Sequence, residues 1–300
     1  MTESLRVRAP ATTANLGPGF DCAAVALDLW NELEVSSGDD EPDLDHIGVR
    51  AFARLASLDG RRFTWTTRIP RARGLGSSAA VIALGLVAAA LLESGRADPA
   101  ELFAEGLELE GHGDNLAAAL LGGVCLSWGT KLVRIADRPP AVPIAVIPET
   151  KVSTPASRAA LPSTVAHADA AFTAGRATLL GAALAGGSAE LFAEALTDRL
   201  HEPYRAASAP LLGAVRQPLP AGALGATLSG SGPTVIVWAR DEEAALCEAE
   251  LAKRFPSERV LRLGVATIGA APAPLEGLAE NRSSPGCDDR SLGRTQGEPS

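Results

Sequence analysis

The sequence predicts an α+β fold with two domains. Its 300 residues are enough for two domains, and 46% of them are hydrophobic, so each domain can bury a core. Strand-like and helix-like segments come in runs, without the strict alternation of a parallel α/β sheet. A group of prolines in residues 136–150 indicates a boundary. We therefore expect domains at residues 1–145 and 146–276, followed by a tail at residues 277–300.

The first part of the chain is expected to begin with two strands, at residues 5–9 and 24–35. Apolar and polar residues alternate in the second of them, as in a half-buried strand. An acidic loop follows, and Asp45 is placed to cap a helix at residues 46–58 whose apolar residues share one face. Residues 61–69 alternate again and predict the next strand.

The middle of the chain is expected to hold three helices and then three strands. A continuously apolar run predicts a buried first helix, and two glycines end the third. The expected helices are residues 79–92, 100–110 and 115–121, and the expected strands are residues 124–128, 131–135 and 142–147.

The second half of the chain is rich in alanine and is expected to be helical from residue 154 to about residue 217. Pro162, Gly186, Gly187 and Pro203 are expected to interrupt the helices. The remaining expected elements are strands at residues 223–228, 234–239 and 260–268 and a helix at residues 242–255. The tail is rich in Gly, Pro and Ser and has no aromatic residue, so we expect it to be mobile.

Composition excludes several classes of function. A net charge of −9 argues against nonspecific binding to nucleic acid, which requires a basic surface. The four cysteines are far apart and the histidines have no metal-ligand spacing, so neither a zinc site nor a disulfide framework is predicted. The N-terminus lacks the apolar core of a signal peptide, and the apolar run at residues 79–92 is too short to cross a bilayer. We expect a cytoplasmic protein with no nucleic-acid or membrane partner.

The strongest local feature is a glycine- and serine-rich segment between a predicted strand and the buried helix. It consists of Pro70, Arg71, Ala72, Arg73, Gly74, Leu75, Gly76, Ser77, Ser78, Ala79 and Ala80. The first turn of a helix has unpaired N–H groups and a positive dipole end, and Gly74 and Gly76 let the backbone approach an anion. Ser77 and Ser78 add hydroxyl groups, so the segment is typical of a phosphate cradle. The alternative is a capped buried helix that follows a flexible turn.

Three motifs in order carry a resemblance to a known family. They are PATTANLGPGFD at residues 10–21, the glycine-serine segment at residues 70–80 and GATLSGSGPT at residues 225–234. With these motifs the chain resembles the GHMP kinases, which phosphorylate small molecules with ATP. The resemblance covers about residues 4–270. It implies a ribosomal-protein-S5-like N-terminal domain that binds the nucleotide and a ferredoxin-like C-terminal domain.

Further motifs resemble one branch of this superfamily, the homoserine kinases. They are EGHGDN at residues 110–115, LLGG at 120–123, KVST at 151–154, RAALP at 158–162 and EPYR at 202–205. That branch implies phosphorylation of L-homoserine to O-phospho-L-homoserine with ATP and Mg²⁺, a step of threonine biosynthesis. Two alternatives stay open: another GHMP kinase, of the mevalonate type, and a catalytically inactive regulatory relative. A homodimer is also left open.

The resemblance implies a catalytic set of Asn115, Ser78 and Glu108. Ser78 and Glu108 would hold Mg²⁺, with Glu110 as the alternative carboxylate. Asn115 stands where other GHMP kinases have an aspartate base, so catalysis would depend on positioning. Neighbouring residues of a helix point about 100° apart, so Asp114 is not expected to face the substrate together with Asn115.

Homoserine is a zwitterion with a hydroxyl group, and the planar fork of arginine suits its carboxylate. The substrate-binding residues implied by the resemblance are Asn15, Asp21, His112, Asn115, Thr154, Arg158 and Arg205. Within this set Arg158 and Arg205 would hold the carboxylate, and Asp21 would pair with the ammonium or hydroxyl group. The alternative for Arg205 is an ordinary ion pair with Glu202.

Two loops complete the expected site. The second glycine loop, formed by Ser229, Gly230, Ser231 and Gly232, would fold against the nucleotide loop; the alternative is a plain β-turn. Ala72 and Arg73 depart from the glycine and serine that many relatives have at these positions. The departure would stiffen the nucleotide loop and place Arg71 and Arg73 beside the phosphates.

Overall fold

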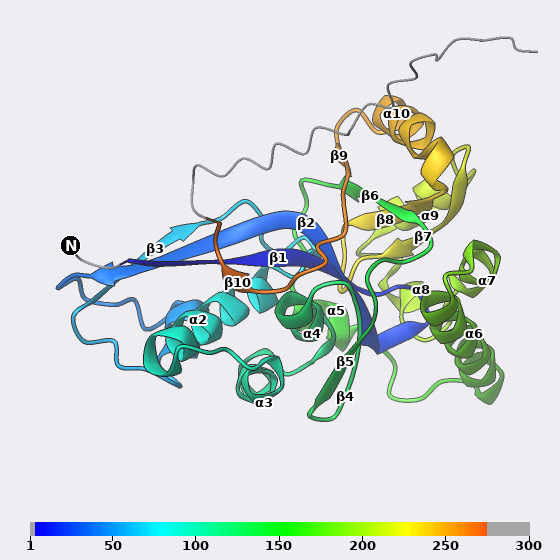
Figure 1. Ribbon diagram of the computed structural model, residues 1–300. Coiled ribbons are helices and arrows are strands. Elements are labelled where there is room, and N and C mark those ends of the chain that lie inside the picture. The colour runs from blue at the N-terminus through cyan, green and yellow to red at the C-terminus, as the bar shows by residue number, and fades with distance from the viewer. Residues whose placement is uncertain (1–3, 275–300) are drawn as a thin grey trace, which may run out of the picture.

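The computed structural model describes residues 4–274, and the expectation for the tail at residues 277–300 lies outside them. Two antiparallel sheets form the framework of the protein (Figure 1). The strands are β1 (Leu5–Asn15), β2 (Gly19–Ser37), β3 (Arg61–Thr66), β4 (Val124–Trp128), β5 (Lys131–Ala136), β6 (Val142–Ile147), β7 (Ala223–Leu228), β8 (Val235–Ala239), β9 (Arg259–Arg262) and β10 (Ala271–Pro272). The helices are α1 (Ile47–Phe52), α2 (Ser77–Ser94), α3 (Pro99–Glu110), α4 (Asp114–Leu121), α5 (Thr154–Ala159), α6 (His167–Gly186), α7 (Ala189–Ala195), α8 (Glu202–Arg205), α9 (Pro210–Arg216) and α10 (Ala244–Arg254), with a 3₁₀ turn at Asp241–Glu243.

The first sheet is built around the long strands β1 and β2. Its order is β10-β1-β2-β4-β5, and β3 pairs with the far end of β2. Strand β1 runs past the expected end at residue 9, because a register shift between Pro10 and Ala11 lets the strand continue beyond the proline. The PATTAN part of the first motif therefore lies in a strand of the first sheet, and the rest of the motif leads into β2.

Helix α2 is the centre of the larger core. It packs on β1 and β2 and contacts α1, α3 and α4. Figure 1 shows α3 and α4 beside it. The helix is apolar around its whole circumference, as expected for a helix buried on all sides. It is longer than the expected run at residues 79–92, and it is the one helix in residues 4–274 with the length and composition to cross a membrane. Within the structure 67% of it is buried.

The second sheet has the order β7-β8-β6-β9, and every pairing in it is antiparallel. The strands of this sheet and the helices between them follow one another along the chain as a β-α-β-β-α-β unit. Helices α5 to α9 take the place of the first helix, and α10 is the second. This arrangement is the ferredoxin-like topology expected for the C-terminal domain. Alternate residues of β8 enter different cores. Trp238 packs against Phe192 of α7 in the larger core, and Val237 belongs to the smaller core, which includes residues of α9 and α10.

The chain passes from the first sheet to the second between β5 and β6. Strand β6 belongs entirely to the second sheet, so the expected boundary after residue 145 falls inside a strand and is a few residues late. Strand β10, although it comes last, returns to pair with β1 in the first sheet. The expected strand at residues 260–268 is also too long, because the chain leaves β9 after Arg262 and crosses to β2, where Ala266 donates to the carbonyl of Ala26.

The expected helix at residues 46–58 is much shorter in the structure. It ends at Phe52, and the chain continues as turns in which Leu55 and Leu58 still pack on the core. The spacing of the apolar residues therefore predicted correctly which side chains pack on the core, but it did not predict where the helix ends. Asp45 does not cap the helix, since His46 is the N-cap residue and no side chain accepts a hydrogen bond there.

Candidate active site

The nucleotide loop leads directly into the first turn of α2. Gly76 is the N-cap residue with φ +63°, no side chain caps the helix, and the first turn holds no acidic residue. The unpaired N–H groups and the positive dipole end at the start of α2 are therefore available to an anion. A side chain at Gly76 would collide with the hydroxyl of Thr12, so the close approach of the loop to β1 requires glycine.

The second glycine loop lies against the nucleotide loop and does not project as a free turn. Ser229 Oγ donates to the carbonyl of Gly74 at 2.6 Å, and the N–H of Thr234 donates to the carbonyl of Arg73 at 3.3 Å. A side chain at Gly74 would collide with the carbonyl of Ser229. The N–H of Gly230 bonds the carbonyl of Ala14, so the loop is fixed to β1 as well.

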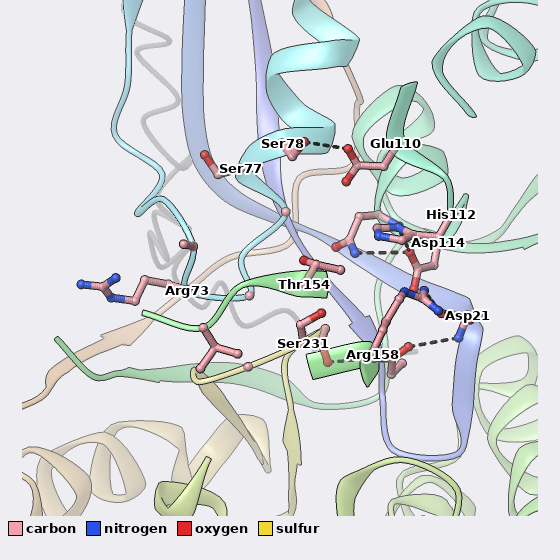
Figure 2. Close-up of a pocket in the computed structure, with 18 of the residues that line it drawn as sticks. Asp21, Arg73, Ser77, Ser78, Glu110, His112, Asp114, Thr154, Arg158 and Ser231 are labelled. Carbon is pink, nitrogen blue, oxygen red and sulfur yellow. Dashed lines mark hydrogen bonds and ion pairs between the residues drawn. The ribbon is translucent and has the colours of Figure 1, made fainter. Parts of the chain in front are cut away.

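Ser78 contacts Glu110 and not Glu108. Ser78 Oγ donates to Glu110 Oε2 at 2.6 Å across the space between α2 and α3 (Figure 2). Burial raises the pKa of Glu110, although the hydrogen bond from Ser78 opposes that shift. Glu108 pairs with Arg54 at 2.6 Å, and its side chain is 70% exposed. The expected placement of Glu108 beside Ser78 is therefore wrong: two residues correspond to about 200° around a helix, which turns Glu108 away from the pocket.

Asp21 and Arg158 form an ion pair at the pocket, between the first motif and α5 (Figure 2). Both terminal nitrogens of the guanidinium donate, Nη2 to one carboxylate oxygen at 2.6 Å and Nη1 to the other at 3.0 Å. Ser153 caps α5 by accepting the N–H of Ala156. Thr154 and Arg158 both line the pocket from this helix.

Arg205 is a buried cation in the lining of the pocket. Only 2% of the residue is exposed, and no carboxylate in residues 4–274 forms an ion pair with it. Burial lowers the pKa of Arg205, and the nearby positive charge of Arg158 acts in the same direction. The alternative partner, Glu202, instead pairs with Arg216 at 2.7 Å and accepts the N–H of Leu228.

The polar residues of the EGHGDN segment face the pocket together. Asn115 accepts a hydrogen bond from Thr12 Oγ1 at 2.7 Å. Asp114 and Asn115 both line the pocket, contrary to expectation, because they occupy the first turn of α4, where the carboxylate of Asp114 folds back onto the N–H of Asn115. Asp114 also lies 3.5 Å from the ring of His112, and this contact raises the pKa of His112.

Three of the residues that line the pocket are not glycine and yet have left-handed backbone conformations. They are Asn15 with φ +74°, Asp21 with φ +54° and Ala72 with φ +56°. Such conformations are unfavourable for residues with a Cβ, and they are typical of functional sites that the surrounding structure holds in place. The amide of Asn15 supports this segment, since it donates to the carbonyl of Gly230 and accepts the N–H of Asp21.

Arg73 does not place its charge beside the phosphate cradle. Its guanidinium donates to the carbonyls of Pro148 at 2.8 Å and of Glu149, so the side chain points away from the start of α2 (Figure 2). Arg71 is exposed and does not line the pocket. The expectation of two added cations beside the phosphates is therefore wrong. Arg73 instead joins the nucleotide loop to the segment that precedes α5.

One pocket collects most of the expected site residues. Those that line it are Asn15, Asp21, Ala72, Arg73, Gly74, Gly76, Ser77, Ser78, His112, Asn115, Thr154, Arg158, Arg205, Gly230, Ser231 and Gly232, together with Glu110, Asp114 and Val152. Glu108, Ser229 and the remaining residues of the nucleotide segment lie outside the lining. No group of three or more His, Cys, Asp or Glu residues in the described part of the chain is placed to hold a metal, so any cation here depends on a mixed set of ligands.

Comparison with known proteins identifies the family. Family models for the GHMP kinases N terminal domain and the GHMP kinases C terminal match residues 46–123 and 180–257. A homoserine kinase from Streptomyces coelicolor is 38% identical over 298 residues, which cover 91% of this chain and 95% of that protein. The chain belongs to the homoserine kinase family of the GHMP kinases.

Solved structures agree with membership of the homoserine kinase family. The structure of homoserine kinase from Cytophaga hutchinsonii matches with a TM-score of 0.79 and 26% identity, over 91% of this chain and 98% of that one. A mevalonate kinase structure matches with a TM-score of 0.67 at 16% identity, which shows the shared fold alone. The expected α+β architecture of a GHMP kinase is thus confirmed, and the use of ATP follows from the kinase family.

Proposed function

We propose that this homoserine kinase family member transfers the terminal phosphoryl group of ATP to the hydroxyl of L-homoserine in the pocket between the two glycine loops. The observation that carries the proposal is the charge arrangement at one end of the pocket. The ion pair of Asp21 and Arg158 lies beside Arg205, whose charge has no carboxylate partner among the described residues. Two arginines and one carboxylate suit an amino acid, which brings one of each charge.

A zwitterion can enter this ion pair without leaving a charge unpaired. Its carboxylate would take the place of Asp21 on Arg158 and would also neutralise Arg205. Its ammonium group would then pair with the released carboxylate of Asp21. A substrate that lacks either charge leaves at least one partially buried group without a partner, which is costly. The exchange therefore selects amino acids over neutral alcohols and over simple hydroxy acids.

Ser78 and Glu110 are the proposed magnesium ligands. A hydroxyl and a carboxylate oxygen are the hard ligands that Mg²⁺ prefers, and the two side chains already meet at the phosphate end of the pocket. Burial disfavours the charged form of Glu110, so a cation there would satisfy it. The ion supplies charge neutralisation for the phosphates when bound. Asn115, Asp114 and His112 would orient the hydroxyl of the substrate, and the start of α2 would hold the phosphates.

The two alternatives are less well supported. A mevalonate-type substrate has no ammonium group and would not use the pairing of Asp21 with Arg158. A catalytically inactive relative has no need to retain Ser78 and Glu110 in contact beside an open helix N-terminus. We propose a cytoplasmic enzyme of threonine biosynthesis whose partner is the small molecule L-homoserine.

A panel of alcohols tests the proposed substrate. With ATP and Mg²⁺, we expect the release of ADP to be fastest with L-homoserine and much slower with L-serine, galactose and mevalonate, because only homoserine has both the charges and the chain length. Homoserinol, which lacks the carboxylate, should be a poor substrate. A preference for an alcohol that is not an amino acid would contradict the proposal.

A further inference from the structure

His201 joins the first motif to Arg205 from within the core. The residue is fully buried and immediately precedes α8. Its Nε2 lies 2.8 Å from the carbonyl of Gly17, and its Nδ1 lies 3.1 Å from Nη1 of Arg205. One imidazole ring thus connects the loop before β2 with the buried arginine in the lining of the pocket. His201 does not itself line the pocket.

The two contacts define the protonation state of the ring. A carbonyl oxygen can only accept, so Nε2 carries the hydrogen that bonds Gly17. A guanidinium can only donate, so Nδ1 is the unprotonated acceptor for Arg205. Both contacts require the same neutral tautomer. Burial also lowers the pKa of His201, against the opposing influence of the Asp198 and Glu202 carboxylates, and Arg205 acts in the same direction as burial.

The contacts of Arg205 leave one edge of its guanidinium free. The two N–H groups of Nη1 are directed to His201 Nδ1 and to the carbonyl of Gly230, both at 3.1 Å. Nε is buried with no hydrogen-bond partner. No hydrogen bond from Nη2 is formed within the described residues. The Nε–H and Nη2–H groups form the edge that can bind both oxygens of a carboxylate.

We propose that His201 is a positioning residue for substrate binding: by accepting from Nη1 it orients Arg205 so that the Nε–Nη2 edge is presented to the carboxylate of the substrate. The inference rests on the proposed function, because it assigns that carboxylate to Arg205. Phe20 supports the arrangement, since its ring stacks on His201 at 4.9 Å and lies 5.3 Å from the guanidinium carbon of Arg205.

Two substitutions of His201 separate the Nδ1 contact from the Nε2 contact. His201→Asn places an amide oxygen near the position of Nδ1, so it keeps the acceptor for Arg205 and loses the bond to Gly17. His201→Gln places an amide N–H near the position of Nε2, so it keeps the donor to Gly17 and loses the acceptor. We expect His201→Gln to raise the KM for homoserine about tenfold, with kcat and the KM for ATP little changed, and His201→Asn to raise it much less.

A substrate without the carboxylate distinguishes positioning from a general structural role. With homoserinol, His201→Gln should be about as active as the wild type, because Arg205 then has no carboxylate to bind. Equal effects of the two variants on the KM for homoserine, no effect of either, or a loss confined to kcat would overturn the inference. A wild type that does not phosphorylate homoserine would instead overturn the proposed function, so the two failures are distinguishable.

A measurement on the wild type keeps the test valid if a buried His201 variant does not fold. Nitrogen NMR of ¹⁵N-histidine-labelled enzyme at neutral pH reports the tautomer of each ring. The signals of the other three histidines are assigned by replacing His46, His112 and His167 one at a time, which leaves His201. We expect a neutral ring with hydrogen on Nε2. A ring that carries hydrogen on Nδ1 would overturn the inference, because it could not accept from Arg205.

Discussion

Glu110→Gln is expected to lower kcat by about a hundredfold or more while homoserine still binds. The change removes the charge of a proposed magnesium ligand and keeps the shape of the side chain. The melting temperature should stay the same or rise at neutral pH. Burial raises the pKa of Glu110 in the folded protein, so its carboxylate costs stability above that pKa, and the amide removes this cost. Steady-state kinetics and a thermal melt measure both effects.

Glu108→Gln is the matched control for this prediction. Glu108 is on the same helix, but it pairs with Arg54 on the surface and not with Ser78. An exposed ion pair contributes little to the stability of the folded protein, so the melting temperature should stay close to that of the wild type. Activity should also be unchanged, because Glu108 does not line the pocket. If Glu108→Gln were the inactive variant and Glu110→Gln were active, the proposed magnesium site would be wrong.

Arg205→Lys is expected to raise the KM for homoserine at least about tenfold, which corresponds to about 1.4 kcal/mol, with little change in the KM for ATP. Lysine keeps the charge but has no planar fork, so it cannot both bond Gly230 and His201 and bind two carboxylate oxygens. Arg158→Lys should act in the same direction, because it removes the two-pronged contact now made with Asp21.

Arg216→Lys is the matched control for the arginine substitutions. Like Arg158, Arg216 is partly buried and ion-paired. Its partners are Glu202 and the carbonyl of Ala226, and it does not line the pocket. Its replacement should change stability and leave the KM for homoserine unaltered. Wild-type values of that KM in both Arg205→Lys and Arg158→Lys would contradict the proposed binding of the carboxylate.

The local elements of this fold could be predicted well from the sequence. The expected strands β4, β6 and β7 have the bounds found in the structure, because alternation and flanking turn residues are local signals. The path after β9 could not be predicted. Residues 263–270 leave one sheet and cross to the other, and that crossing depends on contacts with β2 that are distant in sequence.

The candidate site shows the same division between local and long-range information. The proposed phosphate cradle at the start of α2 could be predicted from its glycines and serines alone. Whether Glu108 or Glu110 lies beside Ser78 depends on how α3 is rotated about its axis relative to α2. No pattern of residues in the sequence specifies that rotation. The pairing of Asp21 with Arg158 joins residues 137 positions apart. The role proposed for His201 has no signal in the sequence, since its contacts with Gly17 and Arg205 form only when the loop before β2 lies against α8.

The identity of the phosphorylated product tests the central claim most directly. The enzyme is incubated with ATP, Mg²⁺ and L-homoserine, and the product is analysed by phosphorus NMR with proton coupling. Transfer to the hydroxyl predicts a phosphomonoester signal that is split by the methylene protons next to the oxygen of homoserine. A product whose phosphorus is bonded to the amino nitrogen, or inorganic phosphate as the only new phosphorus species besides ADP, would contradict the account.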